Sequence, residues 1–140
     1  MLLAALLDLD RGPPDTLESL LRAAVRELDV GADLKVERSS EGGFRCTRVV
    51  VGAQAPPPLR RLDDLEAALS GATLLPPAVR LRSLTALRRL ARIEADLHGV
   101  RVDEVHFHEI GAVDTLVDVT GVFLCMGRAV EPDHDTPWAV

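Results

Sequence analysis

Histidines and carboxylates gather between positions 98 and 118 of this sequence. Three of its four histidines occur there, with acidic residues at short spacing after them. The candidate functional residues are His98, His106, His108, Glu109, Asp114 and Asp118. Imidazole nitrogens and carboxylate oxygens together suit nickel, zinc, manganese or iron better than calcium. The segment therefore predicts a site for a transition-metal ion.

The local pattern indicates how the chain would bring these side chains together. A strand over residues 105–109 directs His106 and His108 to one face, because side chains alternate along a strand. A helix starting near residue 112 places Asp114 and Asp118 on one face, since residues four apart are neighbours on a helix. We expect the imidazoles to converge with these carboxylates where the strand meets the helix.

Other interpretations of the same residues are open. The histidines could be hydrogen-bonded in a core without metal, with His98 a cation near a helix C-terminus. Asp114 could face the positive end of a helix dipole, and Asp118 could be a solvated surface residue. A His-x-His strand also opens the metal sites of some barrel hydrolases. Such a barrel needs roughly 250 residues, so a chain of 140 residues is too short.

The pattern of apolar residues predicts a helix-rich single domain of the α/β class, or α+β, with a small sheet. Two runs of alternating residues around a polar turn predict a β-hairpin, with strands at 34–37 and 44–51 and the turn at 39–43. Apolar stripes at helical spacing predict helices at 1–9, 15–28, 62–70, 76–98 and from 112 through 126. Gly99 is placed to end the fourth helix, and Gly121 allows close packing of the fifth.

Composition narrows the class of protein. The net charge of −6 argues against a nucleic-acid partner. No apolar run approaches membrane-spanning length, and the apolar opening is too short for a signal peptide. Cys46 and Cys125 belong to no Cys-x-x-Cys pair, which is typical of thiols in a reducing compartment. These features predict a cytoplasmic protein.

The functional segment also carries a family resemblance. Residues 106–118 read HFHEIGAVDTLVD, which closely resembles the signature of the nickel insertion proteins that complete the lactate racemase cofactor, the LarC family. Residues 93–99, IEADLHG, resemble that family's Ala-Glu-Ala…His-Gly segment. Residues 2–9 resemble the helix that follows its first strand. The resemblance spans about residues 1–124, whereas residues 125–140 are expected to form a divergent, flexible tail.

The resemblance implies a nickel chelatase of the lyase class. Such proteins insert nickel into a pyridinium bisthiocarboxylate mononucleotide, a small-molecule precursor, and they use CTP. Carried over by matching positions, His98, His106, His108 and Asp118 are candidate nickel ligands. Glu109 and Asp114 are candidate catalytic residues.

The sequence departs from the family in what it contains. Family members begin with a strand and a glycine-rich turn, and they have a large C-terminal half to which CTP use is attributed. Neither is present here, so we expect the amino-terminal part of such a protein, without the CTP-binding part. The alternative is a non-catalytic nickel-binding or assembly module that acts as a homo-oligomer or with a C-terminal partner chain.

Overall fold

The computed structural model describes residues 2–9, 16–53, 61–107 and 112–129. In these residues the α-helices are α1 (Leu2–Leu9), α2 (Thr16–Glu27), α3 (Leu62–Gly71), α4 (Pro77–His98) and α5 (Ala112–Ala129). A short 3-10 helix, η1, covers Val102–Glu104, and the strands are β1 (Ala32–Glu41) and β2 (Phe44–Ala53). The expected helix-rich domain with a small hairpin sheet is confirmed.

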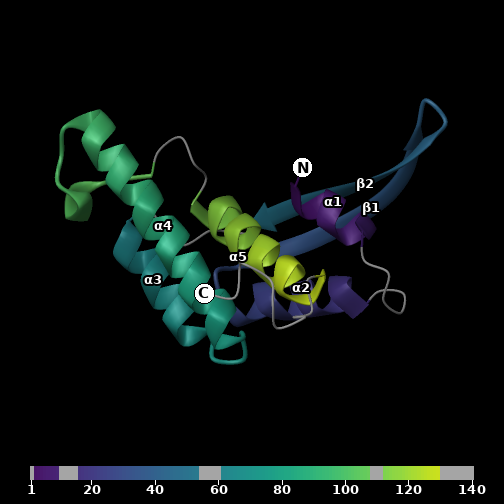
Figure 1. The fold of residues 1–140 in the computed structure, drawn as a ribbon, viewed down its shortest axis with the longest axis horizontal. Coiled ribbons are helices and arrows are strands. Elements are labelled where there is room, and N and C mark those ends of the chain that lie inside the picture. The colour runs from purple at the N-terminus through teal and green to yellow at the C-terminus, as the bar shows by residue number, and fades with distance from the viewer. Residues whose placement is uncertain (1, 10–15, 54–60, 108–111, 130–140) are drawn as a thin grey trace, which may run out of the picture.

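Helix α5 lies at the centre of the fold and contacts α4 on one side and α1, α2 and β2 on the other (Figure 1). Its inward face is almost fully buried, with the side chains of Val113, Leu116, Val117, Leu124 and Cys125. Because the same helix begins directly after the candidate functional segment, its packing fixes where that segment rejoins the domain.

Helix α4 follows the predicted pattern closely. Proline occupies its first turn, where the missing N–H removes no helical hydrogen bond. Leu87, Ala91 and Ala95 form its buried stripe, and the helix packs against α3, α5 and η1. Gly99 ends it in the left-handed conformation, with φ of 64°, which glycine adopts without steric cost.

The hairpin is longer and its turn tighter than expected. Residues 39–41 belong to β1, which pairs antiparallel with β2 from Ala32 opposite Ala53 to Glu41 opposite Phe44. The turn is therefore only Gly42 and Gly43, both with positive φ, as a two-residue turn between twisted strands requires. Figure 1 shows the hairpin reaching outward at the end of the molecule away from α4.

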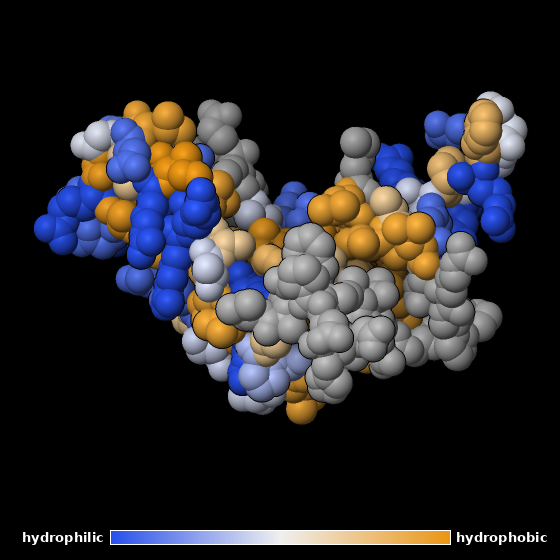
Figure 2. All heavy atoms as spheres, viewed as in Figure 1, coloured by the Kyte–Doolittle hydropathy of each residue, from blue (hydrophilic) through white to orange (hydrophobic). Residues whose placement is uncertain are grey.

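The base of the hairpin is covered by α1 and α2, which pack on β2 and β1, respectively. In the space-filling view of Figure 2, the end of α4 and the tip of the hairpin rise on either side of a hollow. None of the described helices is both long and apolar enough to span a membrane.

We predicted a strand over residues 105–109, and this prediction is wrong for residues 105–107, which are the ones that the structure describes. Residues 102–104 form η1, and residues 105–107 have no regular secondary structure. In the described residues the sheet has two strands, paired only with each other, so this segment has no ladder to join. Val105 nevertheless has an extended backbone, with φ of −63° and ψ of 129°, and the alternation of faces survives.

Candidate functional site

His106 is presented to solvent by its two neighbours. Val105 and Phe107 are 3% and 5% exposed and belong to the hydrophobic core, whereas His106 is exposed. Since the flanking side chains anchor the segment, the imidazole sits on a fixed backbone rather than on a loose loop. It contacts Arg61, whose Nη2 lies 3.5 Å from Nε2 of the ring. A guanidinium can only donate, so Nε2 is the acceptor in this contact.

His98 is the last residue of α4, directly before the helix-ending Gly99, and it is exposed. Its Nε2 lies 3.3 Å from Oε2 of Glu94, one turn earlier on the same helix. The described contact of His98 is thus with its own helix. A histidine and a carboxylate at this spacing can hold part of an ion's coordination shell or form a simple ion pair.

Asp114 and Asp118 share the outward face of α5, as their spacing predicted. Both are exposed, while Val113 and Val117, each one position earlier, are buried. Although the residue as a whole is exposed, desolvation of its carboxylate by the surrounding protein raises the pKa of Asp118 above its ordinary value of 3.8, and the negative charge of Asp114 acts in the same direction. A divalent cation near the pair would relieve this repulsion.

His108 and Glu109 lie outside the described residues. Within residues 2–9, 16–53, 61–107 and 112–129, no three His, Cys, Asp or Glu side chains form a group that could hold an ion. Figure 1 shows the carboxyl end of α4 well away from the first turn of α5. A complete site therefore depends on the segment that carries His108 and Glu109, and its convergence stays a prediction.

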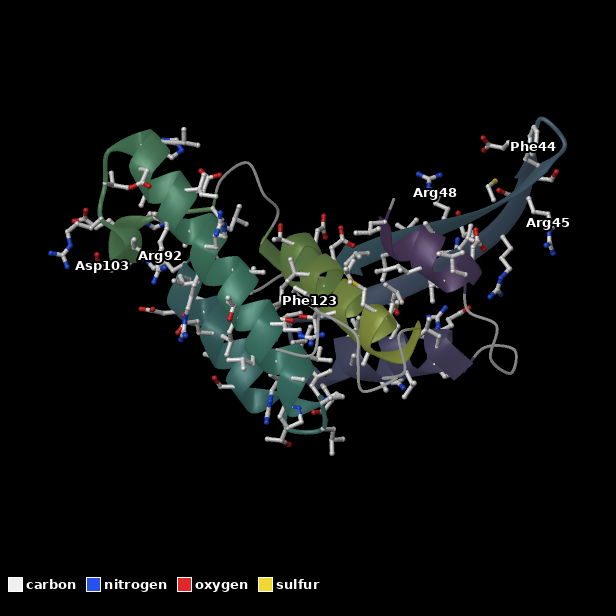
Figure 3. All side chains as sticks on the ribbon, viewed as in Figure 1. Phe44, Arg45, Arg48, Arg92, Asp103 and Phe123 are labelled. Atoms are coloured by element: carbon white, nitrogen blue, oxygen red, sulfur yellow. The ribbon has the colours of Figure 1, made fainter. Side chains whose placement is uncertain are left out.

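A separate groove of about 750 Å³ lies between α2, the start of α4 and the end of α5. Its lining is mainly apolar and includes Phe123, which Figure 3 labels on α5. None of the lining residues is a candidate metal ligand. The groove is therefore distinct from the candidate site.

Arg61 is the neighbour of the site that sequence reasoning missed. It lies 45 positions before His106, and no spacing rule connects the two. The sequence signal was slight, namely an arginine directly before a helix start. Only the packing of α3 on α4 brings it beside the candidate segment.

The structure is therefore that of a small α/β domain in which a histidine-bearing segment connects α4 and α5. The description of the matching family model is "Nickel insertion protein", and the match covers residues 1–133. The chain belongs to this family.

Curated relatives agree with the family model. A putative nickel insertion protein of Thermomicrobium roseum is 46% identical over 123 residues, which cover 87% of this chain and 29% of the relative. A putative nickel insertion protein of Myxococcus xanthus is 36% identical over 141 residues, covering 98% and 35%. In Desulfitobacterium hafniense, a relative named pyridinium-3,5-bisthiocarboxylic acid mononucleotide nickel insertion protein is 36% identical, covering 79% and 27%.

The chain spans about a third or less of the length of these relatives. No solved structure matches it.

Proposed function

We propose that this chain handles nickel for insertion into a pyridinium bisthiocarboxylate mononucleotide, giving the nickel pincer nucleotide of lactate racemase. The proposal is carried by the family match over residues 1–133, together with the substrate that the name of the Desulfitobacterium relative contains. Nickel is here a substrate ion that the protein must take up and release.

The described geometry supports a role in handling an ion. His106 offers an exposed imidazole on a segment fixed by buried Val105 and Phe107. Asp114 and Asp118 offer two carboxylates on one helix face. We assign His98, His106, His108 and Asp118 as nickel ligands and Glu109 and Asp114 as catalytic residues. Glu109 and Asp114 would accept protons from the incoming precursor as its ligand groups replace those of the protein.

Mixed nitrogen and oxygen ligands fit the chemistry of a chelatase. The ion must leave the protein for sulfur and carbon ligands of the precursor, so a closed thiolate cage would hold it too tightly. The chain's two cysteines are not placed for such a cage, because Cys46 lies in β2 and Cys125 is buried in α5. Neither forms a disulfide, which is consistent with our assignment of the protein to the cytoplasm.

Nickel titration by calorimetry tests the proposal. We expect the His106→Ala, His108→Ala double variant to bind nickel at least tenfold more weakly than the parent, because each lost imidazole removes a ligand. His134→Ala, which removes the fourth histidine, is the matched control and is expected to bind as the parent does. Unchanged affinity in the double variant contradicts the site.

A second candidate function is a non-catalytic nickel-binding or assembly module that acts with a partner chain. It assigns to this chain only what its own residues offer, namely imidazole and carboxylate groups for the ion, and leaves the rest of the activity to the part of the relatives that the match does not cover. In this version the CTP-binding and lyase functions belong to the partner. Mass spectrometry of the nickel nucleotide product, formed from precursor, nickel and CTP, separates the two. Product from this chain alone supports the enzyme, and product only after the remaining part of a relative is added supports the module.

A further inference from the structure

We propose that Arg61 binds the phosphate of the mononucleotide precursor and thereby makes nickel binding at His106 depend on the precursor being present. This inference rests on the proposed function, because it takes His106 as a nickel ligand. It adds Arg61, which lies outside the histidine and carboxylate segment 98–118, and it assigns a phosphate group as the ligand of this residue.

Arg61 and His106 are held face to face by two separately packed segments. Arg61 directly precedes α3, and the carboxylate of Asp64 accepts its backbone N–H at 3.2 Å. Leu65 and Leu69, both fully buried, fix that helix in the core. On the other side, buried Phe107 fixes the backbone that carries His106. The 3.5 Å contact of the two side chains therefore joins two backbone segments that are each anchored in the core.

Nearby acidic groups are already engaged. The carboxylate of Asp103 accepts two hydrogen bonds from Arg101, at 2.9 and 3.0 Å. These bonds lower the pKa of Asp103, and the charge of Arg61 lowers it slightly further. Glu104 accepts the backbone N–H of Arg101. The charge of Arg61 is thus felt at Asp103, but the guanidinium of Arg61 makes its described contact with the ring of His106.

The positive charge of a guanidinium in this position lowers the affinity of His106 for nickel. An ion bound to the His106 ring would lie within about 6 Å of the guanidinium charge, since metal–imidazole bonds measure about 2 Å. At water-like screening, a divalent ion at that distance loses roughly tenfold in affinity. Arg61 also lies against Nε2, the nitrogen through which the ring could ligate. It must therefore turn away when the ion arrives.

An anion bound to Arg61 would remove this electrostatic repulsion. The guanidinium is exposed and presents a planar fork that matches phosphate oxygens in a two-point contact. When the precursor phosphate engages the fork, its charge offsets that of Arg61 and draws the guanidinium away from Nε2 of His106. By reciprocity of linked equilibria, nickel and the mononucleotide then strengthen each other's binding. The arrangement would limit capture of nickel when no acceptor is bound.

Calorimetry on the full chain tests the inference with two probes, nickel alone and nicotinamide mononucleotide alone. Nicotinamide riboside, which lacks the phosphate, is the ligand control. We expect Arg61→Gln to bind nickel alone up to about tenfold more tightly and the mononucleotide at least tenfold more weakly. Arg61→Lys should keep the opposition to nickel but lose much of the mononucleotide affinity, because the fork is gone. The affinity for the riboside should be the same in the parent and in all of these variants.

Arg45→Gln is the matched charge control, because Arg45 is exposed near the hairpin tip, far from η1 and its labelled Asp103 (Figure 3). The inference is overturned if Arg61→Gln and Arg45→Gln behave alike toward both probes while nickel binding still depends on His106. If nickel binding does not depend on His106 and His108, the proposed function fails together with the inference. Failure of the inference alone is therefore distinguishable from failure of the nickel site.

Discussion

Substituting Gly121 tests how closely α5 packs on its neighbours. A Cβ added at this position would lie 2.8 Å from Cδ1 of Leu21 and 3.1 and 3.2 Å from the two Cδ atoms of Leu3. Leu21 is fully buried and Leu3 is 3% exposed, so neither side chain can swing into solvent. The methyl group of alanine must therefore displace two core side chains.

The magnitude follows from two opposing effects. Overpacking a core by one methyl group costs about 1–3 kcal/mol, whereas replacing glycine by alanine inside a helix stabilises it by up to about 1 kcal/mol. We expect Gly121→Ala to lower the free energy of unfolding by about 0–3 kcal/mol. Gly127→Ala, in the same helix with no atom within 4 Å of its added Cβ, should instead raise it by up to about 1 kcal/mol.

Urea unfolding followed by circular dichroism measures both variants. The difference between them isolates the steric term and should be about 1–3 kcal/mol. Leu21→Val removes the nearest atom, so Gly121→Ala should cost less in that background than in the parent. Equal changes in stability for Gly121→Ala and Gly127→Ala would refute the close packing of α5 against α1 and α2.

Further outcomes follow from the same structure. Leu87→Ala, at a fully buried position of α4, should lower the free energy of unfolding by about 2–5 kcal/mol in urea titrations, and a change below about 1 kcal/mol would contradict its core position. Phe107→Ala should cost about 3–5 kcal/mol, whereas the adjacent exposed His106→Ala should change stability by less than about 0.5 kcal/mol; thermal unfolding of both variants compares them. Hydrogen bonds from Arg88 lower the pKa of Glu66 below its ordinary value of 4.5, so Glu66 stabilises the fold above that value and loses this effect as the pH falls through its folded-state pKa. Glu66→Gln should therefore lower the urea midpoint at pH 7 but not at pH values below that folded-state pKa, and a pH-independent difference would rule out the ion pair as the cause.

Local sequence signals were sufficient for most secondary structure. The proline-started helix that ends at Gly99, the start of α5 near Ala112 and the face shared by Asp114 and Asp118 are all encoded within one or two helical turns. The two-glycine turn was contained in the predicted polar segment, although its strands extend further toward it. These features depend on backbone preferences and on side-chain spacing, which act between near neighbours.

The sequence by itself determined the kinds of residue available for chemistry and the family to which they point. Only the tertiary structure decided which side chains meet. Residues 105–107 alternate as a strand would but pair with no strand among the residues that the structure describes, because pairing depends on what lies alongside in space. Arg61 reaches His106 for the same reason: α3 packs on α4 through buried leucines, a contact between residues too far apart in the chain for any local pattern to encode.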